Sequence, residues 1–258
     1  NAQGLVENVQ ILSSNLVQNP SFSEEGVQEV SNGSFSQEGS ELVTNGDFAT
    51  DLSGWSNTNS YWQWSSQGAY HPLGSVNNGL NQYFTNQSNK LTFSVEIISG
   101  ALVVEFGGNH TFTESGVYTI YGTTNFVNFK RSGSLECYID NVSVREVGQD
   151  WVLDANWSIA EDKAVSDGSV NGFIRTSTNL FENGKTYKVG ITVSDMTTGK
   201  VTYPYDGAGG TFITTNGDFS QTYYADDTNR CWIYGSNGFD GSITNISVKE
   251  VGQNWTLG

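Results

Sequence analysis

Hydrophobic and polar residues alternate along several short stretches of the chain. Leu91–Ile97 places Leu, Phe, Val and Ile on one side and Thr, Ser and Glu on the other. Tyr187–Val193 repeats this pattern later in the chain. A period of two residues is typical of a strand with one buried face. Both stretches are therefore predicted to be β-strands that line a core.

Turn residues separate these stretches. Gly107-Gly108 and Asn183-Gly184 favour tight connections between strands. Alternation breaks near Asn141, which predicts a β-bulge at that position. No window sustains a helical period. The pattern predicts an all-β fold made of tandem jelly-roll β-sandwiches.

One long segment of the sequence occurs twice. Ile139–Trp151 returns as Ile243–Trp255, 104 residues later. This offset is about one domain length, so it indicates a duplicated folding unit and not a solenoid turn. We predict module 1 at residues 41–150 and module 2 at residues 151–258, after an N-terminal extended segment at residues 1–40. Trp151 and Trp255 are expected to fix the angle between modules, and we expect the chain to be a piece of a longer array.

A shorter repeat occupies the N-terminal region. Asn-Pro-Ser-Phe, Asn-Gly-Ser-Phe and Asn-Gly-Asp-Phe motifs begin at residues 19, 32 and 45, a spacing of 13. Each unit offers a short extended run, a turn and one phenylalanine to bury. A unit this small cannot form its own core, so it must lie against a module or another subunit. The expected anchors are Val17 and Phe22 in the first unit, Val30 and Phe35 in the second, and Val43 and Phe48 in the third.

The chain is strongly acidic. Its 27 Asp and Glu against 11 Lys and Arg give a formal charge of −16. Nucleic-acid binding needs clustered cations, so it is not expected. Membrane contact is not expected either, because no apolar run approaches a membrane helix and anionic surfaces would repel the chain. Cys137 and Cys231 occupy non-equivalent positions in the two modules, which predicts two free, buried thiols.

Three features of module 1 carry a family resemblance. They are the opening Glu41–Phe48, the following Gly54-Trp55 and the closing Tyr138–Val144. Together they resemble carbohydrate-binding modules of the family-four and family-nine type, which are jelly rolls. In module 2 only the region of Trp157 and the closing strand match this pattern. The 13-residue units and the Val-Gly-Gln-Asn-Trp junction resemble repetitive structural and fibre proteins of aquatic bacteriophages. Neither resemblance implies a particular ligand, because one fold hosts many functions.

Aromatic residues cluster early in module 1, at Tyr61, Trp62, Trp64 and Tyr70. Flat aromatic rings stack on sugar rings and neighbouring amides bind hydroxyls, so this cluster is a candidate glycan-binding site. On a strand, Trp62 and Trp64 would share one side. Alternatively, that side is the core of the sandwich, where aromatic residues usually lie. The corresponding stretch of module 2, residues 159–163, has no aromatic residue, which favours a structural role.

Two acidic residues are candidates for a calcium site in module 1. The family resemblance implies that Asp140 could contribute to structural calcium binding, and Asp47 could supply a further oxygen ligand. The alternative is that both are solvated turn residues. Thr244 replaces the acid in module 2, which argues against a site there. Calcium is the only cofactor that the sequence suggests.

Sequence motifs of enzyme chemistry are missing. The two histidines, His71 and His110, have no counterpart in module 2, and no common hydrolase or metalloprotease motif occurs. We predict a non-enzymatic structural protein, a component of a virion appendage or extracellular fibre, located on a virion surface or outside the cell. Its predicted partners are copies of itself or other structural subunits, joined by strand addition. The alternative is an array of carbohydrate-binding modules in a secreted enzyme or adhesin, with surface glycans as ligands.

Overall fold

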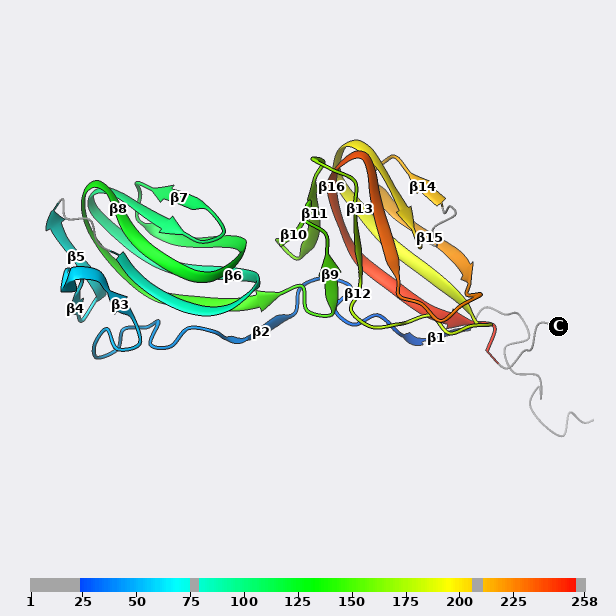
Figure 1. The fold of residues 1–258 in the computed structure, drawn as a ribbon, viewed down its shortest axis with the longest axis horizontal. Helices are drawn as coiled ribbons and strands as arrows, with labels where there is room; N and C mark the ends of the chain where they lie inside the picture. The colour runs from blue at the N-terminus through cyan, green and yellow to red at the C-terminus, as the bar shows by residue number, and fades with distance from the viewer. Residues whose placement is uncertain (1–23, 75–78, 206–210, 254–258) are drawn as a thin grey trace, which may run out of the picture.

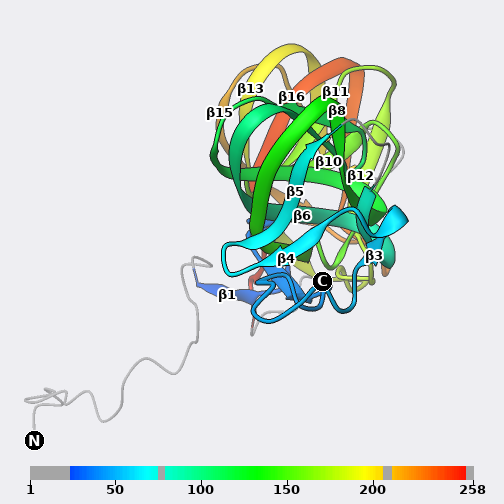
Figure 2. The ribbon, with the colours of Figure 1, turned by 90° about the vertical axis from the view of Figure 1, so that its left-hand side faces the viewer.

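The computed structural model describes residues 24–74, 79–205 and 211–253. Figure 1 shows them as two β-rich bodies that lie end to end, and Figure 2 shows the curled sheets along the long axis. Each body is one hydrogen-bonded sheet that curls around its own core. The all-β, jelly-roll type of sandwich predicted from the alternation is confirmed. Within the described residues, no helix has the length and apolar character needed to cross a membrane.

The sheet of module 1 contains seven strands. They are β2 (Glu38–Glu41), β3 (Ser56–Asn57), β4 (Gln63–Ser65), β5 (Gly68–Gly74), β6 (Gly79–Glu105), β7 (Asn109–Phe112) and β8 (Gly116–Val147), with a 3-10 turn η1 (Thr58–Ser60) between β3 and β4. The long strands β6 and β8 bend and pair twice. Residues 89–95 of β6 lie between residues 116–122 and 139–146 of β8. These two strands therefore form most of the sandwich.

The sheet of module 2 contains nine strands. They are β1 (Glu25–Gln28), β9 (Trp151–Leu153), β10 (Trp157–Ala160), β11 (Lys163–Asp167), β12 (Gly172–Thr176), β13 (Thr186–Tyr203), β14 (Thr211–Ile213), β15 (Gly217–Tyr224) and β16 (Trp232–Val251). Residues 186–193 of β13 lie between β15 and the end of β16. The closing strand of each module is the last part of β8 in module 1 and of β16 in module 2. The hairpin β10–β11 corresponds to β4–β5, because β5 pairs with β8 and β11 pairs with β16. Module 2 thus repeats the central arrangement of module 1.

The alternation predicted from the sequence matches the buried faces of both modules. Leu91, Phe93 and Val95 are buried, and so is every second residue from Tyr187 to Val193. The predicted bulge is present: Asn141 has a φ of 54°, and the pairing with β6 shifts beside it. Asparagine tolerates this left-handed conformation better than most residues. The same bulge recurs in the closing strand of module 2.

Each module buries a separate apolar core, but the core of module 2 draws on distant parts of the chain. It includes Val30 and Phe35 from the N-terminal segment and Val147 from the end of module 1. Cys137 and Cys231 are free and buried, as predicted. Desolvation raises the pKa of both thiols to about 12. The thiols therefore behave as small apolar core groups.

The N-terminal segment runs along both modules. β1 pairs with β16 of module 2, and β2 pairs with β8 of module 1. In Figure 1 this segment is the blue trace that passes beneath both bodies. We call residues 25–48 the strap. The domain boundaries at 40/41 and 150/151 stay a prediction. The 13-residue spacing of the units did not indicate that residues 25–35 join the sheet and core of module 2.

Candidate functional site: a strap across two modules

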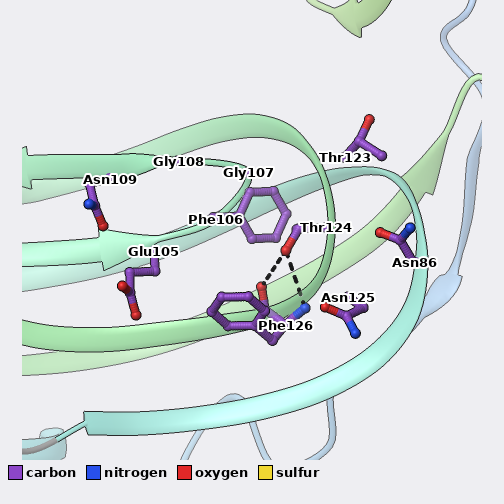
Figure 3. Close-up of a pocket in the computed structure, with 10 residues that line it drawn as sticks. All are labelled: Asn86, Glu105, Phe106, Gly107, Gly108, Asn109, Thr123, Thr124, Asn125 and Phe126. Atoms are coloured by element: carbon purple, nitrogen blue, oxygen red, sulfur yellow. Dashed lines mark hydrogen bonds between the residues drawn. The ribbon is translucent and has the colours of Figure 1, made fainter. Parts of the chain in front are cut away.

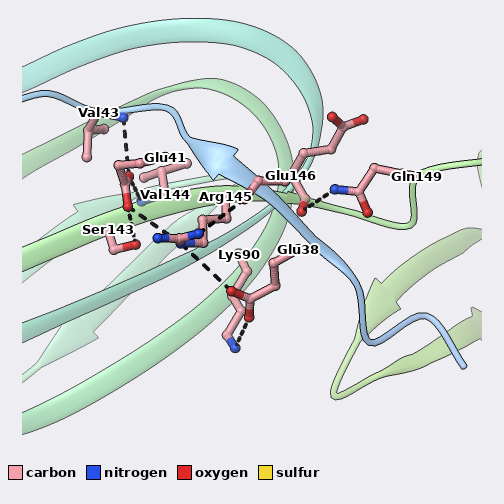
Figure 4. Close-up of polar contacts among 10 residues, drawn as sticks. Glu38, Glu41, Val43, Lys90, Ser143, Val144, Arg145, Glu146 and Gln149 are labelled. Carbon is pink, nitrogen blue, oxygen red and sulfur yellow. Dashed lines mark hydrogen bonds and ion pairs between the residues drawn. The ribbon is translucent and has the colours of Figure 1, made fainter. Parts of the chain in front are cut away.

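The strap lies antiparallel to the closing strand of module 1 (Figure 4). The carboxylate Oε1 of Glu41 accepts a hydrogen bond from the backbone N–H of Val144 at 2.7 Å. The N–H of Leu42 donates to the carbonyl of Val144 at 2.9 Å, and the N–H of Val142 donates to the carbonyl of Gly46 at 2.8 Å. Backbone groups that would otherwise lie unpaired at a sheet edge are therefore satisfied by the strap.

The strap makes the same contacts with module 2. Gln28 Oε1 accepts from the N–H of Val248 at 2.7 Å, in the place of Glu41. The N–H of Glu29 donates to the carbonyl of Val248 at 2.8 Å, and the N–H of Ile246 donates to the carbonyl of Gly33 at 2.8 Å. The strap residues lie 13 positions earlier and the module residues 104 positions later than their counterparts. The short repeat and the long repeat therefore encode one interface that occurs twice.

One glutamate near the start of each strap strand lies between two cations. On module 1, Glu38 contacts Lys90 Nζ at 2.6 Å and Arg145 Nε at 3.8 Å. Arg145 also reaches Glu41 Oε2 at 3.6 Å. These partly exposed ion pairs add register and modest stability to the paired strands.

On module 2, Glu25 lies between Lys188 at 2.5 Å and Lys249 at 2.9 Å. Hydrogen bonds from Lys188 and then Lys249 lower the pKa of this carboxyl to about 2. Glu25 therefore carries its charge throughout the physiological pH range. In both modules the strap glutamate therefore pairs with one cation on the closing strand, Arg145 or Lys249, and with one on the neighbouring strand, Lys90 or Lys188.

Glycine is required at one position of each strap unit. A Cβ on Gly33 would lie 2.0 Å from Ile246 O, and a Cβ on Gly46 would lie 1.9 Å from Val142 O. Any larger residue would collide with the backbone of the closing strand. The asparagine before the glycine has a φ of 50° in the second unit and 51° in the third. The Asn-Gly pair therefore gives the strap its close approach to the module.

The second and third units each bury their phenylalanine against a tryptophan. The rings of Phe48 and Trp55 are 5.4 Å apart, and those of Phe35 and Trp151 are 5.2 Å apart. Each indole N–H donates to the carbonyl of the unit's own asparagine, at 3.0 Å in the third unit and 3.1 Å in the second. Four of the predicted anchors are buried, namely Val30, Phe35, Val43 and Phe48. Their role in assembly between molecules stays a prediction.

The first unit lies outside the described residues, as do its anchors Val17 and Phe22 and the junction residue Trp255. Its sequence departs from the other two units, because Pro20 replaces the glycine.

The two tryptophans of the predicted glycan cluster have different surroundings. Trp62 is 2% exposed, whereas Trp64 is 46% exposed and donates its indole N–H to Phe48 O at 2.7 Å. Trp62 precedes β4, so the alternation of that strand does not extend to it. Trp157 and Ile159 take the corresponding places in module 2, so the corresponding stretch does contain an aromatic residue and the alignment with residues 159–163 was wrong. The structure therefore does not form one stacking platform from Trp62 and Trp64.

The two tyrosines of the cluster are half-buried. The ring of Tyr61 lies 4.9 Å from that of His71. Tyr70 stacks on Tyr138 at 4.7 Å and donates its hydroxyl to Glu136 at 2.8 Å. This hydrogen bond, helped by desolvation, raises the pKa of Tyr70 to about 12. The glycan-binding role of these residues stays a prediction.

A surface hollow of about 470 Å³, which the sequence did not indicate, lies on module 1 (Figure 3). Its lining residues are Asn86, Glu105, Phe106, Gly107, Gly108, Asn109, Thr123, Thr124, Asn125 and Phe126. Glu105 binds Lys130 and also accepts from Asn128 at 2.6 Å, and these contacts lower its pKa. The amides and aromatic rings around the hollow are groups that recognise hydroxylated ligands. The Gly107-Gly108 turn that the sequence predicts forms part of this lining, but nothing in the sequence marked a hollow there.

Of the two candidate calcium ligands, Asp47 lies in a turn of the strap and Asp140 lies in β8, beside the bulge at Asn141. The hydrogen bond between Val142 N–H and Gly46 O joins the two segments. Asp140 accepts from the backbone N–H of Asn141 at 2.8 Å and from its side-chain amide at 3.2 Å. Asp47 is exposed. Across the described ranges, no three or more Asp, Glu, His or Cys residues form a group that could hold a metal ion. Calcium binding by this pair therefore stays a prediction.

No family model matches the chain, and no curated protein matches it. Allantoicase from Saccharomyces cerevisiae is a similar solved structure, with a TM-score of 0.28 and 10% identity over 81% of this chain and 92% of that one. The secreted serine protease VesC from Vibrio cholerae has a TM-score of 0.29 and 11% identity over 79% of this chain and 53% of that one. A triple jelly-roll protein from the turret of an archaeal virus has a TM-score of 0.24 and 13% identity over 71% of this chain and 54% of that one. Likeness this low carries no argument about function.

Proposed function

We propose that this chain is a non-enzymatic structural protein, a modular β-sandwich component of a virion appendage or extracellular fibre. The observation that supports this most is the strap, which adds one strand to each module and places Val30 and Phe35 in the core of module 2. Two connections therefore join the modules, the linker after Val147 and the strap before Glu38. A double connection restricts hinge motion between modules, as an extended appendage requires.

The distribution of reactive groups supports a role without catalysis. His71 is fully buried, with Nδ1 at 3.1 Å from Leu135 O, and His110 Nε2 lies 3.2 Å from Phe106 O. Burial holds both thiols in their protonated form. Both histidines and both thiols, which are side chains of the kinds that act as bases or nucleophiles, are thus engaged in the fold. The bacteriophage resemblance of the repeats points to the same structural role.

Assembly between molecules would use the same strand-type contact. The strap shows how a unit with a valine, an Asn-Gly turn and a phenylalanine can complete a closing strand that is distant in sequence. Main-chain hydrogen bonds supply affinity in such contacts without exact side-chain matching. The net charge of −16 would limit lateral sticking of the β-rich surface. The predicted partners are further copies of this chain or other structural subunits.

Electron microscopy and sedimentation of the full chain and of a chain starting at residue 24 test this function. The shorter chain keeps every strap contact described above but lacks Val17 and Phe22. We expect elongated assemblies from the full chain and single two-module particles from the shorter one. Phe22→Ala should reproduce the loss, and Ser21→Ala serves as the matched control. Equal assembly by all four chains would refute assembly through the first unit.

A second candidate function is glycan binding, and the hollow of Figure 3 favours it. Phe126 lines the hollow. The ring centroids of Tyr83 and Phe126 are 5.8 Å apart, and Tyr83 is 68% exposed. Exposed aromatic rings beside amides suit stacking on a sugar. A glycan array with Tyr83→Ala and Trp64→Ala separates the two surfaces, since only the variant that removes the true platform should lose binding. No binding by the unaltered protein would exclude this candidate.

A further inference from the structure

The junction between the modules is a small packed interface. Hairpin β10–β11 of module 2 lies against the end of module 1, where Val147 is 5% exposed. A Cβ on Gly148 would lie 2.6 Å from Ile159 Cγ1, so Ile159 packs directly on this glycine. Across the same junction, Glu38 and, more weakly, Asp162 raise the pKa of Lys90. The hairpin therefore contributes an aliphatic side chain and, three residues later, an acid.

The far end of module 2 repeats the surface that receives this hairpin. Val251-Gly252-Gln253 corresponds to Val147-Gly148-Gln149, and both glycines have a φ of 73°. Gln149 donates its side-chain amide to Glu146 O at 2.9 Å, and Gln253 donates to Glu250 O at 2.6 Å. The local conformation is thus the same at both ends.

The covering of the two ends differs. No described atom lies within 4 Å of a Cβ built on Gly252, whereas Ile159 fills that place at Gly148. Val251 is half-buried, whereas Val147 is buried. Lys188 stands in the place of Lys90, because both pair with the strap glutamate of their module. The end of module 2 therefore has the shape and charge of an end of module 1 whose hairpin has been removed.

We infer that this end surface, formed by Val251, Gly252 and Lys188, docks the β-hairpin of a further module of the same type. A second copy of this chain does not supply a matching hairpin. Its Ile159 hairpin is covered by its own module 1, and its free hairpin β4–β5 carries Trp64 and Gln67 in the places of Ile159 and Asp162. The inference rests on the proposed structural function and names the partner of that array.

A three-module chain tests this inference, made by joining residues 151–258 directly after residue 254. We expect amide hydrogen exchange at Val251 and Gly252 to slow by at least about tenfold relative to the unaltered chain. An Ile159→Asp change in the added module alone should abolish the slowing, whereas Ser158→Ala, next to it on the hairpin, should not. Unchanged exchange at Val251 and Gly252 beside a folded added module would overturn the inference.

A second chain supplies the added module with a strap strand of its own. Residues 12–24 are replaced by a copy of residues 25–37, which keeps the 13-residue register and provides glycine in place of Pro20. If the added module folds only in this version, the same exchange measurement is decisive. The outcome is separable from the proposed function, because assembly of the unaltered chain and docking of an added module are measured independently.

Discussion

Modules 1 and 2 have the same interface with the strap but receive it by different routes. In module 1 the unit that ends at Phe48 is followed within a few residues by its tryptophan, Trp55. In module 2 the whole of module 1 separates Phe35 from Trp151. The contact geometry is almost unchanged by this difference. The strap contact is therefore a self-contained device, and it does not depend on how the chain connects its two halves.

The different routes make the two modules unequal during folding. β2 pairs Glu38 with Val147, so a folded module 1 holds both ends of its own sequence side by side. This brings Phe35 close to Trp151 before module 2 forms. Shortening the effective loop from roughly a hundred residues to fewer than ten lowers the closure cost by about 2 kcal/mol. Module 2 should therefore depend on module 1, whereas module 1 should not depend on module 2.

The largest expected effect comes from removing one buried ring. Phe35→Ala and Phe48→Ala should each lower the free energy of unfolding of the affected module by about 3–5 kcal/mol. Phe35→Ala should act on module 2 alone, whereas Phe48→Ala should weaken both modules. Hydrogen exchange in denaturant, read separately over β6 and β13, measures this. Equal weakening of module 1 by both variants would contradict the unequal dependence.

Adding one methyl group at the strap glycine should have the next largest effect. Gly33→Ala places a Cβ against Ile246 O and should lower the free energy of unfolding of module 2 by about 1–3 kcal/mol. Gly46→Ala should do the same to module 1. Gly108→Ala is the matched control, because its nearest neighbour would be His110 Nε2 at 3.9 Å. Thermal unfolding of the three variants compares them, and a neutral Gly33→Ala would mean that the strap is held less closely than described.

A longer strap sharpens the comparison. Six Gly and Ser residues inserted after Gln37 would roughly double the short effective loop and lower the free energy of unfolding of module 2 by about 0.6 kcal/mol. If module 1 did not bring Phe35 and Trp151 together, the loop between them would have roughly a hundred residues. The same insertion would then have no measurable effect. The control is the same insertion after Glu114, in the exposed connection between β7 and β8 of module 1. Denaturant titration gives the free energy of unfolding of module 2 in each variant. If the insertion after Gln37 left it unchanged, module 1 would not be bringing Phe35 and Trp151 together before module 2 folds.

Local patterns predicted the strands but not their long-range partners. Alternation at Leu91–Ile97 depends on one buried face, and the bulge at Asn141 depends on one residue, so both could be read from neighbouring positions. Which module a strap unit binds depends on the path of the chain in space. A repeat spacing of 13 residues contains no information about that path. One signal was available: the unit at Phe35 has no tryptophan soon after it, and Trp151 has no unit just before it. The two could have been paired by elimination.

The candidate sites show the same limit. Trp62 and Trp64 fit the period of a strand, but β4 begins after Trp62 and the two side chains have different exposures. The hollow of Figure 3 was missed because its lining comes from separate parts of β6 and β8 and from the connection between β6 and β7. Residues as far apart as Asn86 and Asn125 meet only when those strands curl. Sequence spacing contains this information only when the register of both strands is known.

The smallest expected effect is the pH dependence of the stability that Glu25 gives to module 2. The folded-state pKa of Glu25 is about 2, below its usual value of 4.5, because Lys188 and Lys249 bind the carboxylate. A lowered pKa in the folded state contributes stability that is fully present above pH 4.5 and is lost as the pH falls toward 2. The advantage of the unaltered chain over Glu25→Gln should therefore shrink across this window, and it should be small throughout because the pair is exposed. Thermal unfolding of module 2 at pH 7 and pH 2.5, with Glu24→Gln as the neighbouring control, measures this. An equal advantage at both pH values would show that Glu25 acts through packing and not through its charge.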